Sequence, residues 1–406
     1  MIVLISSGQP SLNPRLVKEA DALTEAGYEV TVIYQYWNQW GTAYDPALLS
    51  QKKWKSIRVG GTPNEEKVTF WKTRLINKIA VFFAKNFGFD NGIAEMAIGR
   101  CMQLLIKKAE SIPAQFYIAH NLAAIPAAYR ASIKNKGKYG FDAEDFHRNE
   151  ESNDPDSFEV RLKTYLEDKY FPKLNHFTTA SPLISWAYQE IYEQLTPTTL
   201  LNVFPAQRVA KSSIQSDKLK LFWFSQTIGL NRGLEIVIAA MGLLKDLSIE
   251  LHLLGAHDEN TIQTFTEIAA KENINSYQIQ FYQPIAPNDI FAFAAQFDIG
   301  LATETSIPKN RDICLTNKIF TYIQSQLAIV ASATSAQQDL LKSYPKMGKL
   351  FSNNDPRSLA DVLTNYAKDR QLLLAHQLQA LHYAQKELNW EKESLKLINQ
   401  VRQVIA

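Results

Sequence analysis

The stretch ISSGQPSLNPRLVKEADALTEAGYEVTVIYQY (residues 5–36) has the pattern of a strand, a loop, a helix and a second strand. Residues 2–5 form a short, fully apolar run, which is typical of a strand that is buried on both faces. Asn13 and Pro14 predict the start of the helix, as its N-cap and first residue, and Gly27 predicts its end. The stretch therefore predicts a βαβ unit, whose parallel crossover is expected to be right-handed.

The loop of this unit contains one glycine, Gly8, where a dinucleotide-binding turn contains three. An NAD site is therefore not expected here. A single small residue can still let backbone N–H groups approach a sugar or a phosphate, which makes Gly8 a candidate binding residue. An ordinary turn between a strand and a helix explains Gly8 equally well, and both interpretations stay open.

The alternation of strand and helix recurs along the whole chain. Apolar runs predict further strands at 116–120, 139–142, 176–180, 199–204, 219–224, 249–255, 278–282, 297–302 and 327–332. Helical patterns fit between them, notably at 233–244 and 259–271, and the segment after Pro356 is mostly helical. A polar stretch without periodicity, residues 206–218, predicts a linker. The chain is therefore expected to form two α/β domains in tandem, each with a doubly wound parallel sheet.

Composition narrows the class of protein. The chain has 406 residues, enough for two or three domains, and its 46% of hydrophobic residues argues against global disorder. A net charge of +2 gives no general nucleic-acid footprint, so no nucleic-acid partner is expected. The two cysteines suit a reducing compartment, and no apolar run reaches the roughly 18 residues that span a bilayer. A cytoplasmic protein is the expectation.

Several segments, in their order along the chain, resemble one enzyme family. The first domain contributes PSLNPRLVKEADALTEAGYEVTVI (10–33), FYIAHNLAAIPAA (116–128) and FDAEDFHRNE (141–150). The second contributes WFSQTIGLNRGLEIVIAAM (223–241), LHLLG (251–255), FYQPIAPNDI (281–290), FDIGLA (297–302) and LTNKIFTYIQSQLAIVAS (315–332). The segment KELNWEKESLKLINQV (386–401), with Trp390, follows near the end of the chain. Together they resemble the GT-B glycosyltransferases of the retaining, family 4-like group.

The resemblance implies a fold and an activity. The fold is α/β, with two tandem Rossmann-like sheets, a cleft between them and a C-terminal helix that crosses back to the first domain. The domains are expected at 1–205 for the acceptor, 206–385 for the nucleotide-sugar donor and 386–406 for the crossover helix. The activity is transfer of a sugar from a nucleoside diphosphate to a saccharide or lipid-linked acceptor, in polysaccharide or glycolipid synthesis. The donor is a substrate, and neither a cofactor nor a metal is expected.

The resemblance also places the candidate residues. Arg232 stands just before a predicted helix, where a guanidinium suits a diphosphate, and it is a candidate catalytic residue. His120, at the end of a predicted strand, is the second candidate catalytic residue, because the family has a histidine there that contacts the transferred sugar. The alternative is that His120 has a structural role only. Donor binding is assigned to Gly8, Gly229, Arg232, Gly255, Glu304, Asn317, Lys318 and Thr321. Acceptor binding is assigned to Asp142, Glu144 and Asp145, for which a solvated acidic loop is the alternative.

The donor segments also depart from the family pattern. Gln226 stands where the family usually has a second cation, and Thr321 stands where it has a ribose-binding glutamate. A threonine makes one hydrogen bond where a carboxylate makes two charged ones. The family glycine that follows is replaced by Gln326. A catalytically degenerate GT-B protein, acting as a binding or scaffold partner of a transferase, is therefore the alternative function.

One segment of the first domain mixes aromatic and basic residues. Residues 68–87, VTFWKTRLINKIAVFFAKNF, mix aromatic residues, among them Trp71, Phe82 and Phe83, with the basic residues Lys72, Arg74, Lys78 and Lys85. This composition fits an interfacial helix on anionic lipid. An ordinary amphipathic helix of the first domain is the favoured interpretation. If the helix is interfacial, the protein contacts the inner face of the membrane peripherally and its acceptor is expected to be lipid-linked.

Overall fold

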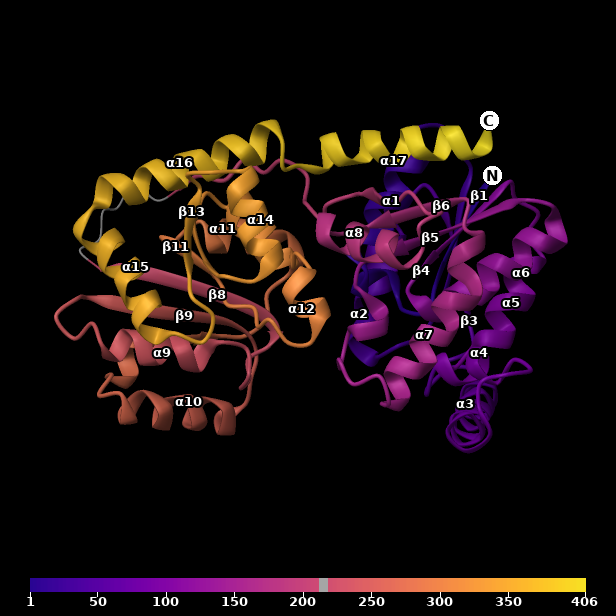
Figure 1. Cartoon of the computed structure of the whole chain (residues 1–406), viewed down its shortest axis with the longest axis horizontal. Helices are drawn as coiled ribbons and strands as arrows, with labels where there is room; N and C mark the ends of the chain where they lie inside the picture. Colours follow the sequence, from indigo (N-terminus) through magenta and orange to yellow (C-terminus); the bar gives the residue numbers. More distant parts are fainter. Residues whose placement is uncertain (212–217) are drawn as a thin grey trace. The chain divides into compact units, whose positions relative to one another are not determined.

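The computed structural model describes residues 1–211 and 218–406. Residues 212–217 belong to the stretch predicted as a linker and lie outside the described residues. The chain divides into two compact units (Figure 1). Unit 1 comprises Met1–Leu200 and Ser394–Ala406, and unit 2 comprises Leu201–Glu393. The changes of unit therefore lie at 200/201 and 393/394, where the sequence had suggested 205/206 and 385/386.

Unit 1 is built on a parallel sheet of seven described strands in the order β3-β2-β1-β4-β5-β6-β7. Its strands are β1 (Ile2–Ser6), β2 (Val30–Gln35), β3 (Lys55–Val59), β4 (Phe116–His120), β5 (Lys138–Ala143), β6 (His176–Thr179) and β7 (Thr198–Thr199). Every residue of β1, β2, β4 and β6 is buried, as the largely apolar sequences of β1, β2 and β4 predict and although three of the four residues of β6 are polar. The sequence pattern missed β3, whose residues are half-buried or exposed.

The predicted strand at 199–204 is wrong beyond its first residue. Only Thr198 and Thr199 pair with β6. The Leu200 N–H still donates to the Thr179 carbonyl of β6 at 2.9 Å. The next backbone groups bond to side chains instead: the Leu200 carbonyl accepts from Arg15 at 2.6 Å, and the Leu201 N–H donates to Glu393 at 2.9 Å. These two side-chain bonds take the place of ladder bonds, so the pairing with β6 does not continue past Leu200.

The helices of unit 1 surround this sheet. They are α1 (Pro14–Glu25), α2 (Gln39–Leu49), α3 (Lys67–Phe87), α4 (Ile93–Ile98), α5 (Met102–Glu110), α6 (Ile125–Asn135), α7 (Phe158–Tyr170), α8 (Pro182–Ile191) and the part of α17 (Trp390–Ile405) from Ser394 onward. The predicted ends of α1 are confirmed: the Asn13 side chain accepts from the Leu16 N–H at 2.9 Å, and Gly27 follows the helix with φ of +92°.

Unit 2 contains a second parallel sheet, of six described strands in the order β10-β9-β8-β11-β12-β13. Its strands are β8 (Leu219–Thr227), β9 (Ile249–Ala256), β10 (Ile279–Tyr282), β11 (Ile299–Ala302), β12 (Ala328–Ser332) and β13 (Gly348–Phe351). Its helices are α9 (Leu234–Gly242), α10 (Glu259–Lys271), α11 (Ile290–Ala294), α12 (Lys309–Ile313), α13 (Asn317–Gln324), α14 (Ser335–Ser343), α15 (Pro356–Lys368) and α16 (Arg370–Lys386). The strands predicted at 219–224, 249–255, 278–282, 297–302 and 327–332 all appear, within two or three residues at each end.

The two faces of the unit 2 sheet are covered differently. One face packs on α9, α10 and α15 and forms a core that includes Leu221, Trp223 and Leu301 (Figure 1). On the other face, α13 comes so close that a Cβ on Gly300 would lie 2.2 Å from the Tyr322 ring. Gly300 is therefore required by the approach of the helix to β11.

Both sheets reverse their strand order at one point, between β1 and β4 in unit 1 and between β8 and β11 in unit 2. Open parallel sheets bind ligands outside the carboxyl ends of their strands at such a switch point. The loops after these four strands are therefore where a site is to be sought. Among the described residues, no helix combines the length and the apolar character that crossing a bilayer requires.

A histidine in β6 makes the stability of unit 1 depend on pH. The ring of His176 is 4% exposed, packs edge-on against Phe116, and has no hydrogen-bond partner among the described residues. Burial lowers the pKa of His176 to about 4, while the charges of Asp142 and His120 act on it in opposite directions. The unfolded chain, with an ordinary pKa of about 6.5, takes up this proton first, so stability is lost as the pH falls below about 6.5.

We therefore expect His176→Leu to remove the part of the pH dependence of unfolding that this histidine causes. The native chain should lose about 2 kcal/mol through this histidine between pH 7.5 and pH 5, and the variant should not. Urea denaturation of both proteins at both pH values measures the difference. An identical pH effect in the two proteins would contradict the assignment.

Candidate functional site

A row of polar side chains crosses the carboxyl edge of the unit 1 sheet. Ser6 of β1 pairs in register with His120 of β4, His120 with Asp142 of β5, and Asp142 with Thr178 of β6. Residues paired in register on parallel strands point to the same face of the sheet. All four side chains are fully buried. The sheet therefore gathers polar groups from four strands beneath one helix, α1.

Helix α1 supplies the charges that face this row. Arg15 donates from Nε and Nη2 to the two carboxylate oxygens of Asp142, at 2.6 and 2.7 Å. Glu19, one turn later, lies 3.5 Å from Arg15 Nε and 3.3 Å from His120 Nε2. Asp142 Oδ2 also lies 3.5 Å from His120 Nδ1. Two potential cations and two carboxylates thus form one buried network.

Contacts within the network shift the pKa values of Asp142 and His120 in opposite directions. Burial alone would raise the pKa of Asp142, but the Arg15 guanidinium outweighs burial and lowers it to about 2. Burial alone would lower the pKa of His120, but the charges of Glu19 and Asp142 raise it above its ordinary value. The charges of Arg15 and Asp142 therefore offset each other in a fully buried part of unit 1.

This geometry bears on the predicted roles of His120 and Asp142. Both side chains are 0% exposed. Asp142 accepts hydrogen bonds from Arg15 and Thr178, whereas the ring nitrogens of His120 lie 3.3 Å from Glu19 and 3.5 Å from Asp142 without a hydrogen bond to any described residue. Their contacts describe a structural ion-pair network, which was the alternative for His120. Sugar contact by His120 and acceptor contact by Asp142 stay predictions.

Three members of the network also have the chemistry of metal ligands. One ligand atom each from Glu19, His120 and Asp142 lies within 4.8 Å of the others. Arg15, however, already pairs with both carboxylates, so a cation has taken the place that a metal would need. The residues therefore fit an ion-pair network better than a metal centre.

Partly buried residues adjoin the network at the same edge. Burial and the Asp142 charge raise the pKa of Glu144 to about 7. For Lys18, burial and the Arg15 charge lower the pKa, also to about 7. Asp145 follows in the same loop and is also partly buried. The N–H of Gly8, beyond β1, donates to Ser6 Oγ at 3.0 Å, and a Cβ on Gly8 would meet no atom closer than 3.8 Å. Space alone does not require glycine at this position.

In unit 2, Arg232 lies at the carboxyl end of β8. Its guanidinium is exposed and donates to Ser225 Oγ at 2.7 Å and Thr227 Oγ1 at 3.2 Å, while its carbonyl accepts from Thr303 Oγ1 at 2.8 Å. Gly233 follows with φ of +78°, and a Cβ there would lie 2.6 Å from Thr303 Cβ. The glycine is thus required for the loops after β8 and β11 to meet, and the guanidinium is held in place before α9.

Glu304 and Lys318 are brought together beside that contact. Lys318 Nζ lies 2.5 Å from Glu304 Oε1, which also accepts from Thr316 Oγ1 at 3.1 Å. Arg311 Nη1 lies 3.4 Å from the other oxygen. Burial would raise the pKa of Glu304, but the Lys318 charge lowers it. The carboxylate is therefore ionised, with its charge already matched by two cations.

The other predicted donor residues are placed differently. Thr321 is 1% exposed and bonds back to the Asn317 carbonyl at 3.1 Å inside α13, as a helical threonine commonly does. Asn317 is the partly buried first residue of that helix. A Cβ on Gly255 would lie 2.6 Å from the Ser225 carbonyl, whereas a Cβ on Gly229 would meet nothing within 4 Å. Gly255 therefore supports the segment that holds Arg232, and the binding roles of all four stay predictions.

Sequence reasoning missed several residues of these clusters. Arg15 and Glu19 carry a weak signal, since they are opposite charges one turn apart on a helix whose neighbouring positions are apolar. Ser225, Thr303 and Arg311 carry none, because their roles depend on which loops the sheet brings together.

Comparison with known proteins gives structural likeness only. No protein-family model and no curated protein sequence matches the chain. Anabaena HepE, solved with UDP and glucose, has a TM-score of 0.72 at 13% identity, over 99% of this chain and all of that one. A glycosyltransferase from Rickettsia africae ESF-5 has a TM-score of 0.67 at 12% identity, over 100% of this chain and 98% of the other. Sucrose-phosphate synthase from Thermosynechococcus elongatus has a TM-score of 0.69 at 11% identity, over 99% of this chain and 98% of the other.

These likenesses extend over both units, and the similar structures include a protein described as a glycosyltransferase and a sucrose-phosphate synthase. At such low identity they speak for the fold. Two all-parallel sheets with helices on their faces agree with them. The predicted fold class is confirmed: the chain has the GT-B fold.

Proposed function

We propose that the chain is a glycosyltransferase that moves a sugar from a nucleoside diphosphate to a hydroxyl group of a saccharide or lipid-linked saccharide. The observation that carries the proposal is Arg232, an exposed guanidinium oriented by Ser225 and Thr227 at the carboxyl end of β8. Two structurally similar proteins add support: HepE is described with UDP and glucose, and a variant of Staphylococcus aureus TarM, with a TM-score of 0.68 at 10% identity, is described with UDP. We place the reaction in the synthesis of a cell-surface polysaccharide or glycolipid.

Transfer of the sugar requires positive charge near the departing diphosphate. Negative charge grows on the leaving oxygens in the transition state, and a preorganised cation or helix N-terminus lowers the barrier. Arg232 and the first N–H groups of α9 suit that role. Lys318 suits it less, because Glu304 already neutralises it. We propose a retaining, metal-independent reaction in which the leaving phosphate accepts the proton of the acceptor hydroxyl.

Donor binding tests the proposal directly. Calorimetry with UDP-, GDP- and ADP-sugars is expected to give saturable heat with one nucleotide class. Circular dichroism of the same sample establishes that the protein is folded. Folded protein that releases no heat with any of the donors would speak against the proposal.

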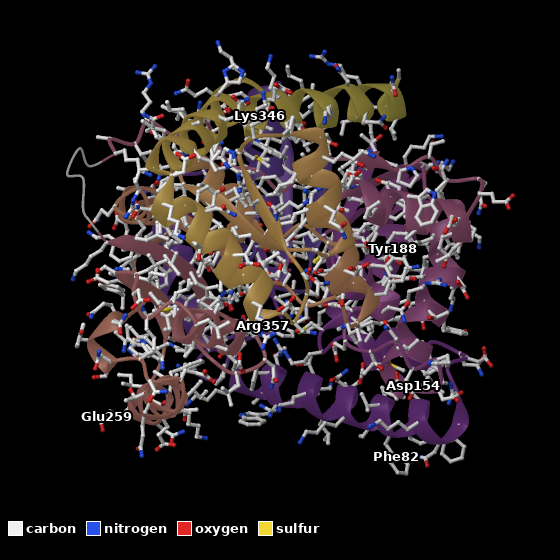
Figure 2. The ribbon with its side chains drawn as sticks, turned by 60° about the vertical axis from the view of Figure 1, so that its left-hand side comes forward. Phe82, Asp154, Tyr188, Glu259, Lys346 and Arg357 are labelled. Carbon is white, nitrogen blue, oxygen red and sulfur yellow. The ribbon has the colours of Figure 1, made fainter. Side chains whose placement is uncertain are left out.

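The outer face of α3 is the observation that supports a lipid-linked acceptor and peripheral contact with a membrane. The helix buries Phe70, Ala80 and Ala84, yet the opposite face is apolar where a surface helix is normally polar. That exposed face comprises Val68, Trp71, Leu75, Ile79, Phe82 and Phe83, exposed by 43–82%. Figure 2 shows Phe82 on the outward side of α3.

The charges of α3 indicate which surface could cover this face. The helix contains no acidic residue, and its exposed basic residues are Lys67, Lys72, Arg74, Lys78 and Lys85. Four of these, all but Lys72, lie along one flank of the apolar face at helical spacing. An aromatic and aliphatic stripe beside a basic flank fits the headgroup region of an anionic bilayer. We propose that the protein binds there, on the inner face of the membrane.

We expect Trp71→Ser/Phe82→Ser to weaken binding to anionic vesicles at least about tenfold, since two large side chains no longer enter the bilayer. Co-sedimentation with phosphatidylcholine vesicles containing phosphatidylglycerol measures the loss. Trp186→Ser/Ile133→Ser is the matched control, because it removes exposed apolar side chains elsewhere on unit 1. Equal losses in both variants, or no vesicle binding by the native chain, would contradict this part of the proposal.

A second candidate function is a degenerate GT-B scaffold. Thr321 offers no carboxylate to a ribose, and its hydroxyl is already bonded within α13. The one nearby carboxylate that was predicted to bind the donor, Glu304, is paired with Lys318 and Arg311. Release of nucleotide from a donor in the presence of an acceptor extract would exclude this alternative. Co-purification with a second transferase, with no donor binding, would favour it.

A further inference from the structure

A cavity of about 450 Å³ lies within unit 1, beside the carboxyl ends of β1 and β2. We call it the α3 cavity, because α3 forms one wall. Its lining comprises Ser7, Gln35, Tyr36, Trp37, Pro63, Phe70, Arg74, Asn77, Ile98, Gly99, Arg100 and Ala123. Two of these residues are arginines and none is acidic, so the cavity is positively charged.

Arg100 is held in this wall entirely by neutral groups. Its Nη1 donates to the Gly60 carbonyl and to Thr73 Oγ1, both at 2.7 Å, and its guanidinium lies 4.7 Å from the centre of the Phe70 ring. Gly60, with φ of +85°, is required there, because a Cβ would lie 2.0 Å from Cys101 Sγ. The loop after β3 thus fixes a partly buried cation that has no carboxylate partner among residues 1–211 and 218–406.

Arg74 adds a second charge on the same side. It is exposed, it contacts the Trp71 ring at 5.4 Å, and it forms no hydrogen bond or ion pair with any residue that the structure describes. Both guanidinium groups line the α3 cavity, so an anion bound between them would reduce the repulsion of two like charges. Burial lowers the pKa of Arg100; Cys101 and Tyr36 act against this effect, and the Arg74 charge adds slightly to it.

The rest of the lining suits a carbohydrate. Gln35 is 2% exposed, and its Nε2 donates to the Ser7 carbonyl at 2.6 Å. Its Oε1 has no hydrogen-bond partner among the described residues, although it is buried in the cavity wall. Such an oxygen can accept a bond from a ligand hydroxyl. Tyr36 and Trp37 add aromatic surface, which suits the apolar faces of a sugar ring.

We propose that the α3 cavity binds an anionic saccharide, that is, a sugar carrying a phosphate or carboxylate group. In this assignment Arg74 and Arg100 bind the anionic group. Gln35 Oε1 accepts a hydrogen bond from a sugar hydroxyl, and Trp37 covers the sugar ring. As an acceptor subsite this assignment rests on the glycosyltransferase proposal, because it states which class of acceptor the enzyme takes. As a binding site it stands on the cavity alone.

Binding of a soluble probe tests the assignment without any turnover. Titration of the full chain with glucose 6-phosphate and with methyl glucoside, followed by ligand-observed NMR, compares a charged and a neutral sugar. We expect the charged sugar to bind at least about tenfold more tightly, and its affinity to fall as salt is added. UDP is present at saturation in a parallel titration, so that any binding of the sugar phosphate at a nucleotide site is separated from the α3 cavity.

Variants then assign the binding to the cavity. Arg74→Gln removes an exposed side chain, so the fold is retained, and it should weaken glucose 6-phosphate about tenfold. Arg130→Gln removes an equal charge from another exposed arginine of unit 1 and should leave the affinity unchanged. Equal affinity for charged and neutral sugar, no binding of either, or the same loss in both variants would overturn the assignment.

A second experiment shows whether the anionic group belongs to a lipid-linked or to a soluble ligand. Phosphatidylinositol vesicles present a cyclitol phosphate at a bilayer, and phosphatidylglycerol vesicles of equal charge serve as reference. A preference for phosphatidylinositol that Arg74→Gln abolishes supports a lipid-linked ligand in the cavity. Arg74-dependent binding of glucose 6-phosphate without that preference supports a soluble one. Because neither arm uses a donor sugar, failure of the glycosyltransferase proposal leaves both results interpretable.

Discussion

The Arg232→Ala variant is expected to lose glycosyl transfer by about 10²–10³-fold while keeping its stability. Removal of one preorganised donor aimed at developing negative charge typically costs a factor of this size. The guanidinium is exposed and donates only to the hydroxyl groups of Ser225 and Thr227, so its loss should change the free energy of unfolding by no more than about 0.5 kcal/mol. Nucleotide release from the donor identified by calorimetry, together with urea denaturation, measures both quantities.

Two further variants separate a specific role from a general effect of charge. Arg357→Ala removes another exposed arginine of unit 2, on α15 (Figure 2), and should leave turnover unchanged. Arg232→Lys keeps the charge but cannot donate to Ser225 and Thr227 in the same planar geometry, so only partial activity is expected. Unchanged turnover in Arg232→Ala would remove the observation on which the proposed function rests.

The Asp142→Ala variant is expected to be destabilised by about 3–5 kcal/mol. The substitution leaves the Arg15 guanidinium fully buried without its bidentate partner, and breaking a buried ion pair from one side typically costs this much. Thr178, which donates to Asp142 at 2.5 Å, loses its acceptor as well. Chemical denaturation followed by tryptophan fluorescence measures the loss, with each unit's transition analysed separately if the two do not unfold together.

A double variant shows whether the cost comes from the stranded charge. Arg15→Met/Asp142→Leu removes both members of the pair and should lose clearly less stability than the sum of the single variants. Ser11→Ala, on the loop before α1, is a control for mild local change. A loss below about 1 kcal/mol in Asp142→Ala would mean that the network is not held together as its geometry implies.

Local patterns accounted for most of the secondary structure. The apolar run at residues 2–5, the cap at Asn13 and the glycine at position 27 give the first βαβ unit, because each acts over a few neighbouring residues. The helix predicted at 259–271 appears with the same bounds as α10. The strand at 199–204 failed because its backbone bonds to Arg15 and Glu393, which are far away in the sequence.

The sequence by itself determined the alternation of strands and helices, the two parallel sheets, and the unusual composition of α3. Only the tertiary structure decided that Arg15 and Glu19 enclose His120 and Asp142, and that Arg74, Arg100 and Gln35 line one cavity. The physical reason is range. Periodicity and helix caps arise between residues a few positions apart, whereas an ion pair across 127 residues depends on strand order and register, which no local pattern encodes.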